Sequence, residues 1–453
     1  MTLLRVGLGS LFVASFVPLG CSSAGGGADS PAFDGGVETS PPPASAPPQD
    51  AGAPDTGRAD FVPASRLAVA CAAEPCYVAV SGNTGEHVCG LLKDGSVRCW
   101  GRDTRPRAET SPDEGEPQAD GALGRGRVVS ALEGATPAPV VGLTGATQIS
   151  VGKNLGTCAR TGDGSVYCWG RNEYGQLGRP AAEARLAVPT RIEGLPPVAS
   201  VALGGSTGCA IASADGALWC WGARDSKIGR AAAEGESISF PPQLMTGFRA
   251  PLRELAIATV RTARTMPFAD TIVALLDGRI LASLGELPAG ESSQPWSPAV
   301  PVPFELHDVA RIGAFGYLGS NRVLSRWVPE SRALYVPAPY TVVDVAIAAT
   351  QDVWSTLQVE QAGVLLSSGR LFRWGVNAAG ALGSPADELD IAEEPRDMTH
   401  VAGNRVVSFA MTTASTCVSL VDGKVKCWGT NQRGELGRGT IDAEEHPEAE
   451  EIR

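Results

Sequence analysis

The stretch Cys158–Gly170 reads CARTGDGSVYCWG. Its central Asp163-Gly164 pair lies between two short alternating runs, and this pattern predicts a tight β-hairpin because glycine reaches positive φ without steric cost. The same phrase, with a central Asp-Gly and a closing Cys-Trp-Gly, recurs at Cys89–Gly101, Cys209–Gly222 and Cys417–Gly429. Each copy is therefore expected to form one hairpin.

Three weaker copies lie between the third and the last of these phrases. They are centred on Asp277-Gly278, Asn321-Arg322 and Ser368-Gly369. A run of small and branched residues precedes a hairpin, as in Ile149–Gly152, and a Gly-rich turn and a Pro-led stretch follow it, as in Asn172–Gly178 and Val188–Ile192. Seven copies of about 55 residues, with four short strands each, predict an all-β, seven-bladed β-propeller of four-stranded blades.

The complete pattern is strand–Gly–Cys-x-x-x-x-Asp-Gly-x-Val-x-Cys-Trp-Gly-x-Asn-x-x-Gly-x-Leu-Gly. It resembles the repeat of the regulator of chromosome condensation family, over about Arg66 to the C-terminus. The resemblance implies the seven-bladed propeller of that family. It also implies a protein-binding role, because the family includes exchange factors, chromatin-binding proteins and secreted bacterial inhibitors of β-lactamase.

The cysteines agree with the hairpins. Facing Cα atoms at non-hydrogen-bonded pairs lie about 4.5 Å apart, within reach of a disulfide. Equal offsets from the central Asp therefore predict the pairs Cys89–Cys99, Cys158–Cys168 and Cys417–Cys427, and a slightly longer loop fits Cys209–Cys220. Cys71 and Cys76 are expected to pair as well, with metal binding by the Cys-x-x-x-x-Cys spacing as the alternative.

Two of the weaker copies support this pairing, because both cysteines are replaced together. Gly316 and Arg326 occupy the two positions in one copy, and Gly363 and Arg373 occupy them in another. The chain has 11 cysteines, so the five pairs leave one over.

Residues 1–20 have the form of an export signal. An apolar run from Val6 to Leu19 follows Arg5 and is too short to span a bilayer. The next residues, Gly20 and Cys21, resemble the end of a bacterial lipoprotein signal, which implies that Cys21 carries lipid; an ordinary cleaved signal is the alternative. Ser22 indicates sorting to the outer membrane. The chain is therefore expected in the bacterial cell envelope, on the periplasmic or the external side.

Residues 21–63 form a Gly/Pro/Ala-rich linker that nearly lacks aliphatic and aromatic side chains. Such a composition buries too little apolar surface to offset the entropy of ordering, so a disordered, flexible tether is expected. Residues 64–453 then form the propeller. Within it, His446–Ile452 resembles the start of a Pro-led stretch and is expected to close the ring by adding a strand to the first blade.

The charge and the residue types exclude several functions. A net charge of −12 argues against nucleic acid as a partner. The four histidines lie far apart, so no metal site is predicted, and no cofactor motif is found. Gly204–Gly208 matches the G-x-S-x-G nucleophile motif, but it falls at a glycine position of the repeat, without the strand-to-helix turn that the motif needs. No catalytic residue and no enzyme activity are predicted.

Insertions that differ between copies are the expected binding sites, because loops on a rigid scaffold carry function. Two are acidic: one carries Glu109, Asp113, Glu114 and Glu116, and the other carries Asp387, Glu388 and Asp390. They are either solvated loops that keep the protein soluble or an acidic face for a basic protein partner or for Ca²⁺.

Two functions remain open. The first is a monomeric, lipid-anchored propeller that binds a protein at the cell envelope or outside the cell, as a scaffold or inhibitor-like module, and meets the membrane only through its lipid. The alternative is a carbohydrate-binding or hydrolytic propeller acting on an extracellular polymer. The recurrent tryptophans, interpreted here as packing between blades, would then form an exposed aromatic ring: Trp100, Trp169, Trp221, Trp327, Trp374 and Trp428.

Overall fold

The chain divides into two units, residues 1–60 and 61–453, and the described residues all belong to the second. The computed structural model describes residues 66–453 apart from 84–86, 104–120, 128, 224–238, 246–250, 261–268, 277–280, 285–308, 314–315, 320–322, 327–333, 336–341, 351–358, 386–390 and 413. The predicted signal and linker lie outside the described residues.

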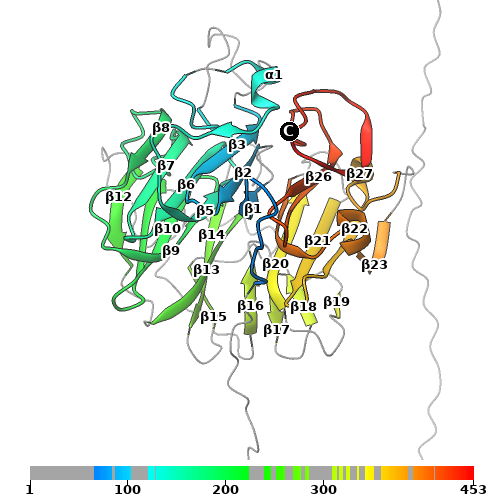
Figure 1. Cartoon of the computed structure of the whole chain (residues 1–453). Helices are drawn as coiled ribbons and strands as arrows, with labels where there is room; N and C mark the ends of the chain where they lie inside the picture. Colours follow the sequence, from blue (N-terminus) through cyan, green and yellow to red (C-terminus); the bar gives the residue numbers. More distant parts are fainter. Residues whose placement is uncertain are drawn as a thin grey trace, which may run out of the picture. The chain divides into compact units, whose positions relative to one another are not determined.

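Seven antiparallel sheets make up the second unit (Figure 1). Their strands follow one another in sequence order, and six of the sheets have four described strands. Blades 1 to 3 consist of β1 (Tyr77–Gly82), β2 (His87–Leu92), β3 (Val97–Gly101) and β4 (Ala138–Pro139); β5 (Ala146–Val151), β6 (Gly156–Thr161), β7 (Val166–Arg171) and β8 (Arg185–Arg191); and β9 (Val198–Leu203), β10 (Thr207–Ala212), β11 (Leu218–Ala223) and β12 (Ser239–Leu244).

Blade 4 has three described strands, and blades 5 to 7 have four each. They consist of β13 (Leu252–Val260), β14 (Ala269–Leu276) and β15 (Leu281–Leu284); β16 (Val309–Gly313), β17 (Gly316–Gly319), β18 (Val323–Arg326) and β19 (Leu334–Tyr335); β20 (Val342–Thr350), β21 (Val359–Leu366), β22 (Leu371–Val376) and β23 (Ile391–Asp397); and β24 (Val406–Met411), β25 (Ser415–Leu420), β26 (Val425–Thr430) and β27 (Glu445–Glu451). Among the described residues, three one-turn helices lie in the connections: α1 (Ala131–Gly134), η2 (Ala378–Gly380) and α2 (Thr399–Ala402).

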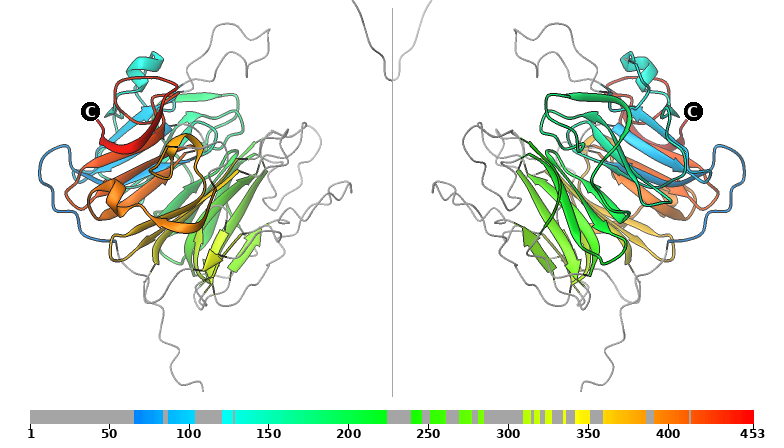
Figure 2. Two further views of the ribbon diagram at one scale, coloured as in Figure 1. Left: turned by 90° about the vertical axis from the view of Figure 1, so that its right-hand side faces the viewer. Right: turned by 90° about the vertical axis from the view of Figure 1, so that its left-hand side faces the viewer.

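Neighbouring blades contact each other through their first strands, which lie innermost. β1 meets β5, β5 meets β9, β9 meets β13, and the series continues through β16, β20 and β24 back to β1. Figure 2 shows the sheets standing side by side around this ring. The predicted seven-bladed β-propeller is therefore confirmed, and three strands of blade 4 are described.

A repeated backbone hydrogen bond joins the blades. The carbonyl oxygen of a hairpin glycine accepts from the N–H that opens the next blade, at 2.8–3.0 Å, in the pairs Gly95–Ala146, Gly164–Val198, Gly216–Leu252, Gly369–Val406 and Gly423–Tyr77. The last pair joins blade 7 to blade 1. Ring closure therefore uses the same contact as the joints between consecutive blades.

The prediction for the C-terminal strand is wrong. β27 pairs with β26 of its own blade, with Lys426 opposite Glu451 and Thr430 opposite Glu445. The physical reason is that blade 1 has no vacancy, because β4 already supplies its outer strand by pairing Ala138 with Cys99. No strand is exchanged between the described ends of the ring.

The five disulfides in the structure are the five that the sequence predicts. The structure contains the disulfides Cys89–Cys99, Cys158–Cys168, Cys209–Cys220 and Cys417–Cys427, with Cα atoms 4.1–4.2 Å apart, and Cys71–Cys76 at 5.6 Å. The replaced positions also face each other, Gly316 opposite Arg326 and Gly363 opposite Arg373. The four hairpin bridges are buried and restrain blades 7, 1, 2 and 3.

The position after the repeated tryptophan needs glycine, because the backbone there lies against a carbonyl oxygen of the turn between the first and second strands of the same blade. Gly170 has φ of 101°, and a Cβ there would overlap the carbonyl oxygen of Leu155 in the turn between β5 and β6. That same oxygen accepts a hydrogen bond from the N–H of Arg171 at 3.0 Å. Gly222 and Gly429 meet the carbonyl oxygens of Ser206 and Ala414 in the same way.

We expect Gly170→Ala to lower the free energy of unfolding by about 2–4 kcal/mol, because the methyl group forces the Leu155 turn away from β7. Gly162→Ala is the matched control, since its φ is not positive and its nearest neighbour would be Thr147 Cγ2 at 3.9 Å. Thermal unfolding of the two variants measures the difference. Equal melting temperatures would show that the turn is not held in place by Gly170.

Candidate binding surface

The strand order gives the propeller two different faces. The turns between the second and third strands, such as 93–96 and 162–165, lie on one side together with the links from blade to blade; we name this side the hairpin face. The turns between first and second strands and the connections between third and fourth strands lie on the other side, the loop face. Helix α1, in the connection that follows β3 of blade 1, lies at the top of Figure 1.

An asparagine organises the Gly-rich turn on the loop face. In blade 2, Asn172 Oδ1 accepts from the N–H of Leu177 at 2.9 Å, and Nδ2 donates to the carbonyl oxygens of Arg179, Pro180 and Glu183 at 3.0–3.2 Å. One buried side chain therefore fixes a whole connection. The equivalents in blades 6 and 7 are Asn377 and Asn431.

Blade 1 has the same turn in a form that the sequence pattern does not reveal. Asp103 takes the place of the asparagine, and its Oδ1 accepts from the N–H of Leu123 at 2.9 Å. Residues 104–120 separate the two halves of the turn, so Gly121–Gly124 stands far from Trp100 in sequence. The acidic insertion of blade 1 therefore begins and ends at the base of a loop-face turn, which is how the fold accommodates it.

The repeated tryptophans connect this turn to the next blade. Trp100, Trp169, Trp221 and Trp428 are 0% exposed. Each indole N–H donates, at 2.8–3.0 Å, to the carbonyl oxygen in the Gly-rich turn of the preceding blade: Glu435, Ala122, Gln176 and Ala381 respectively. Packing between blades is therefore their role, and the alternative of an exposed aromatic ring is wrong for these four. Trp374 is also buried, and Trp327 lies outside the described residues.

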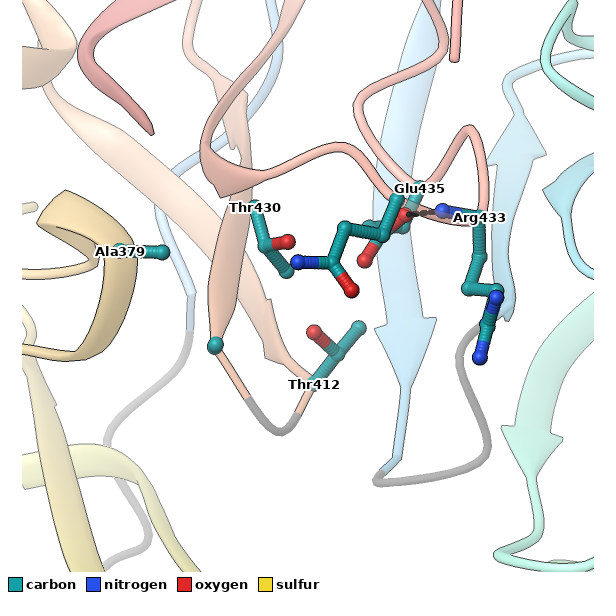
Figure 3. Close-up of a pocket in the computed structure, with 7 residues that line it drawn as sticks. Ala379, Thr412, Thr430, Arg433 and Glu435 are labelled. Atoms are coloured by element: carbon teal, nitrogen blue, oxygen red, sulfur yellow. Dashed lines mark hydrogen bonds between the residues drawn. The ribbon is translucent and has the colours of Figure 1, made fainter. Parts of the chain in front are cut away.

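A pocket of about 190 Å³ opens on the loop face at blade 7 (Figure 3). Its walls come from η2, from the turn between β24 and β25, and from the connection after β26: Ala379, Thr412, Ala414, Thr430, Gln432, Arg433 and Glu435. Glu435 is 2% exposed, and its carboxylate accepts from the N–H of Arg433 at 2.6 Å. Thr412 hydrogen-bonds Ser415 at 2.6 Å through the two hydroxyl groups. Five of the seven lining residues are polar or charged.

Arg373 replaces the disulfide in blade 6. Its guanidinium is 0% exposed and donates to Ala381 O, Thr416 Oγ1 and Gln361 Oε1, so it joins blade 6 to blade 7. Burial lowers the pKa of Arg373 to about 9, because the charged form loses its hydration. The space beside Gly363 is filled by Phe409 of blade 7, whose ring would lie 2.7 Å from a Cβ there.

The Asp-Gly turns carry polar contacts on the hairpin face. Asp163 accepts from Thr161 Oγ1 at 2.6 Å and from the backbone N–H and hydroxyl of Ser165 at 3.1 and 3.0 Å. These hydrogen bonds, led by that from Thr161, lower the pKa of Asp163 to about 2. The same contacts with Ser96 lower the pKa of Asp94. The aspartates of the repeat are therefore structural.

Because folding lowers the pKa of Asp163, this carboxylate stabilises the fold above its usual pKa of about 3.9 and loses that effect as the pH falls towards 2. We expect Asp163→Asn to melt below the wild type at pH 7 and the difference to shrink between pH 4 and pH 2. Glu444→Gln, at an exposed acid, is the control. A difference that is constant over this pH range would contradict the role of the ionised carboxylate.

The remaining predicted site residues are not placed. Cys21 and the acidic residues Glu109, Asp113, Glu114, Glu116, Asp387, Glu388 and Asp390 lie outside the described residues. Within the part that the structure describes, no group of three or more His, Cys, Asp or Glu side chains could hold a metal ion. Within the same part, no helix is long and apolar enough to cross a membrane.

Family comparison identifies the repeats. Residues 163–211 match a family model described as the regulator of chromosome condensation (RCC1) repeat, and residues 146–176 match a second model of the same description. Residues 146–211 therefore carry the RCC1 repeat pattern. The matched stretches cover blade 2 and the first half of blade 3, and the hydrogen bonds described above for these two blades recur in blades 1, 6 and 7.

Two curated proteins are similar to this chain in sequence. The human E3 ubiquitin-protein ligase HERC2 is 25% identical over 292 residues, 64% of this chain and 5% of that protein. The RCC1 domain-containing protein RUG3 of Arabidopsis thaliana is 34% identical over 150 residues, 32% of this chain and 29% of that protein. The chain spans less than a third of the length of either relative.

Solved structures show the same fold. Yeast RCC1 (Prp20), in a crystal structure with Kap60, is similar with a TM-score of 0.59 and 18% identity, over 78% of this chain and 83% of that one. Human WBSCR16 is similar with a TM-score of 0.55 and 16% identity, over 79% and 94%. These likenesses show the β-propeller fold.

Proposed function

We propose that this chain is a lipid-anchored protein of the bacterial cell envelope whose RCC1-type propeller binds a protein partner through its loop face. The anchor is Cys21, at the end of a lipoprotein-type signal. The solved complex of yeast RCC1 with Kap60 supports a protein as the kind of partner, since that relative is itself a binding protein.

The contrast between the two faces carries the proposal. On the hairpin face the described turns repeat one another, with hydrogen-bonded Asp-Gly pairs at Asp94, Asp163, Asp215 and Asp422. On the loop face the connections differ, from 172–184 in blade 2 to 102–137 in blade 1. Loops that vary on a rigid scaffold are where proteins place recognition. The pocket at blade 7 opens on this same face.

The first described residues lie on the hairpin face. Arg66 is the first described residue, and it forms an ion pair with Asp344 at 2.6 Å on the hairpin side of blade 6. The tether therefore joins the propeller on the hairpin face.

The carbohydrate-binding or hydrolytic alternative has less support. Its main argument was an exposed ring of tryptophans, and the four described in full are 0% exposed. The serine of the G-x-S-x-G match, Ser206, is 2% exposed and lies in the turn between β9 and β10, with no strand-to-helix elbow. We propose that the protein has no catalytic activity.

Capture from the cell envelope tests the binding face. The full chain is used as bait beside Gln432→Trp, an exposed position on the loop-face pocket, and Lys93→Trp, an exposed position on the hairpin face. We expect the captured protein to be lost with Gln432→Trp and kept with Lys93→Trp. The reverse result, or glycan binding with no protein captured, would overturn the proposal.

Incorporation of labelled palmitate tests the anchor. We expect the label and the membrane association of the wild-type chain to disappear together in Cys21→Ser. A Cys21→Ser chain that stays in the membrane fraction would refute lipid anchoring and would leave the binding face to be judged by the capture experiment alone.

A further inference from the structure

A short segment before β1 crosses the hairpin face of blades 6 and 7; we name residues 66–76 the strap. The N–H of Ala70 donates to Val421 O at 2.7 Å, and the N–H of Ala72 donates to Asp422 O at 3.1 Å, both in the hairpin turn of blade 7. Before them, Leu67 packs on Gly369, in the hairpin turn of blade 6. The strap therefore links blade 1 to the two preceding blades.

The Cys71–Cys76 bridge ties the strap into a small loop. Cys76 is 0% exposed and lies against Gly423, where a Cβ would come within 2.8 Å of its sulfur. Cys71, at the other end, is half-buried. Among the ten cysteines of the five bridges, Cys71 is the exception, because the other nine are at most 1% exposed.

We propose that Cys71–Cys76 is the exchangeable disulfide of this domain, a site on which an extracytoplasmic dithiol reductant acts while the propeller stays folded. Thiol–disulfide exchange needs a thiolate to reach a sulfur atom of the bridge. Among the described cysteines only Cys71 is more than 1% exposed, so a reductant can approach the bridge at this residue. The four hairpin bridges lie in the packing between blades, so their reduction must wait for a blade to open.

The dithiol reductant supplies the electrons and protons that the exchange needs. One thiolate of the dithiol attacks Cys71 Sγ, the bond to Cys76 breaks, and Cys76 leaves as a thiolate that takes up a proton. The second thiol of the reductant then displaces Cys71 Sγ. The products are two cysteine thiols on the protein and one disulfide on the reductant, so two electrons and two protons move to the protein.

The strap is the element that this reaction controls. With the bridge broken, residues 66–72 are held by two backbone hydrogen bonds, the exposed Arg66–Asp344 ion pair and the Leu67 contact. The hydrogen bond from the N–H of Tyr77 to Gly423 O follows the bridge and belongs to the ring itself. Reduction should therefore free the strap and lengthen the tether while β1 stays in place.

Differential alkylation of the full chain in native buffer tests the chemistry. Dithiothreitol is added, and the thiols are trapped over time and assigned by peptide mass. We expect Cys71 and Cys76 to become labelled at least tenfold faster than Cys158 and Cys168, which serve as the internal control. A hairpin bridge that is reduced as fast, or a Cys71–Cys76 bridge that reacts only as the protein unfolds, would overturn the proposal.

Hydrogen exchange tests the effect on the strap. In the reduced protein, and in Cys71→Ser/Cys76→Ser without reductant, we expect the amides of Ala70 and Ala72 to exchange at least tenfold faster and the amide of Tyr77 to be unchanged. Unchanged exchange at Ala70 and Ala72 would contradict control of the strap by the bridge. Neither the alkylation rate nor the hydrogen exchange depends on a partner or on the lipid. A failure of this proposal can therefore be distinguished from a failure of the proposed function.

Discussion

Amide hydrogen exchange should divide the ring into a slow arc of blades 7, 1, 2 and 3 and a fast arc of blades 4, 5 and 6. The four hairpin disulfides all fall in the first arc, and these blades are consecutive around the ring. A bridge that closes a loop of about ten residues contributes up to about 3 kcal/mol in the chain-entropy model. Local opening free energies that differ by this amount correspond to an exchange difference of about 100-fold.

The equivalent strands β6 and β21 give the sharpest comparison. Both are the second strand of a four-stranded blade, but β6 carries Cys158 and β21 carries Gly363 at the paired position. We expect the amides of β21 to exchange about 100-fold faster than those of β6. In Cys158→Ala/Cys168→Ala, exchange in β6 should rise to the rate of β21. Equal protection of the two strands in the wild type would show that blade packing, and not the bridges, sets local stability.

The hairpins could be predicted from sequence because two independent signals agree on their register. The Asp163-Gly164 turn fixes the centre, and Cys158 opposite Cys168 confirms it. Even where both cysteines are lost, the same register predicts Gly363 opposite Arg373, as the structure has it. Local patterns of this kind suffice because a hairpin is held together by residues that are near in sequence.

The errors and omissions concern residues that are far apart in sequence. The prediction that His446–Ile452 closes the ring by adding a strand to blade 1 is wrong because β4 already pairs there. β4 has two residues and follows the long connection 102–137, so the sequence gives no signal for it. Asp103 in the asparagine position gives no signal, because only the hydrogen bond to Leu123 reveals the equivalence. Nor does the sequence show that Arg373 reaches Thr416 of the next blade.

The joint between blades 7 and 1 gives the second large expected effect. Trp100 donates to Glu435 O at 2.9 Å there, and Trp169 donates to Ala122 O at 3.0 Å between blades 1 and 2. Both rings are 0% exposed, so each tryptophan-to-alanine change should cost about 3–5 kcal/mol of unfolding free energy. The two joints differ in one respect: residues 140–145 connect blade 1 to blade 2, and no such link connects blade 7 to blade 1.

This difference makes Trp169→Ala the matched control for Trp100→Ala. When Trp169 is lost, the short link keeps blades 1 and 2 at a high effective concentration, and they dock again after each opening. When Trp100 is lost, the Tyr77–Gly423 hydrogen bond, the strap and the remaining packing must close the ring. We expect Trp100→Ala to melt at the lower temperature and to raise hydrogen exchange in β1 and β24, which Trp169→Ala leaves protected. If the amides of β1 and β24 exchange equally slowly in both variants, closure of the ring does not depend on Trp100. The other contacts between blades 7 and 1 are then sufficient.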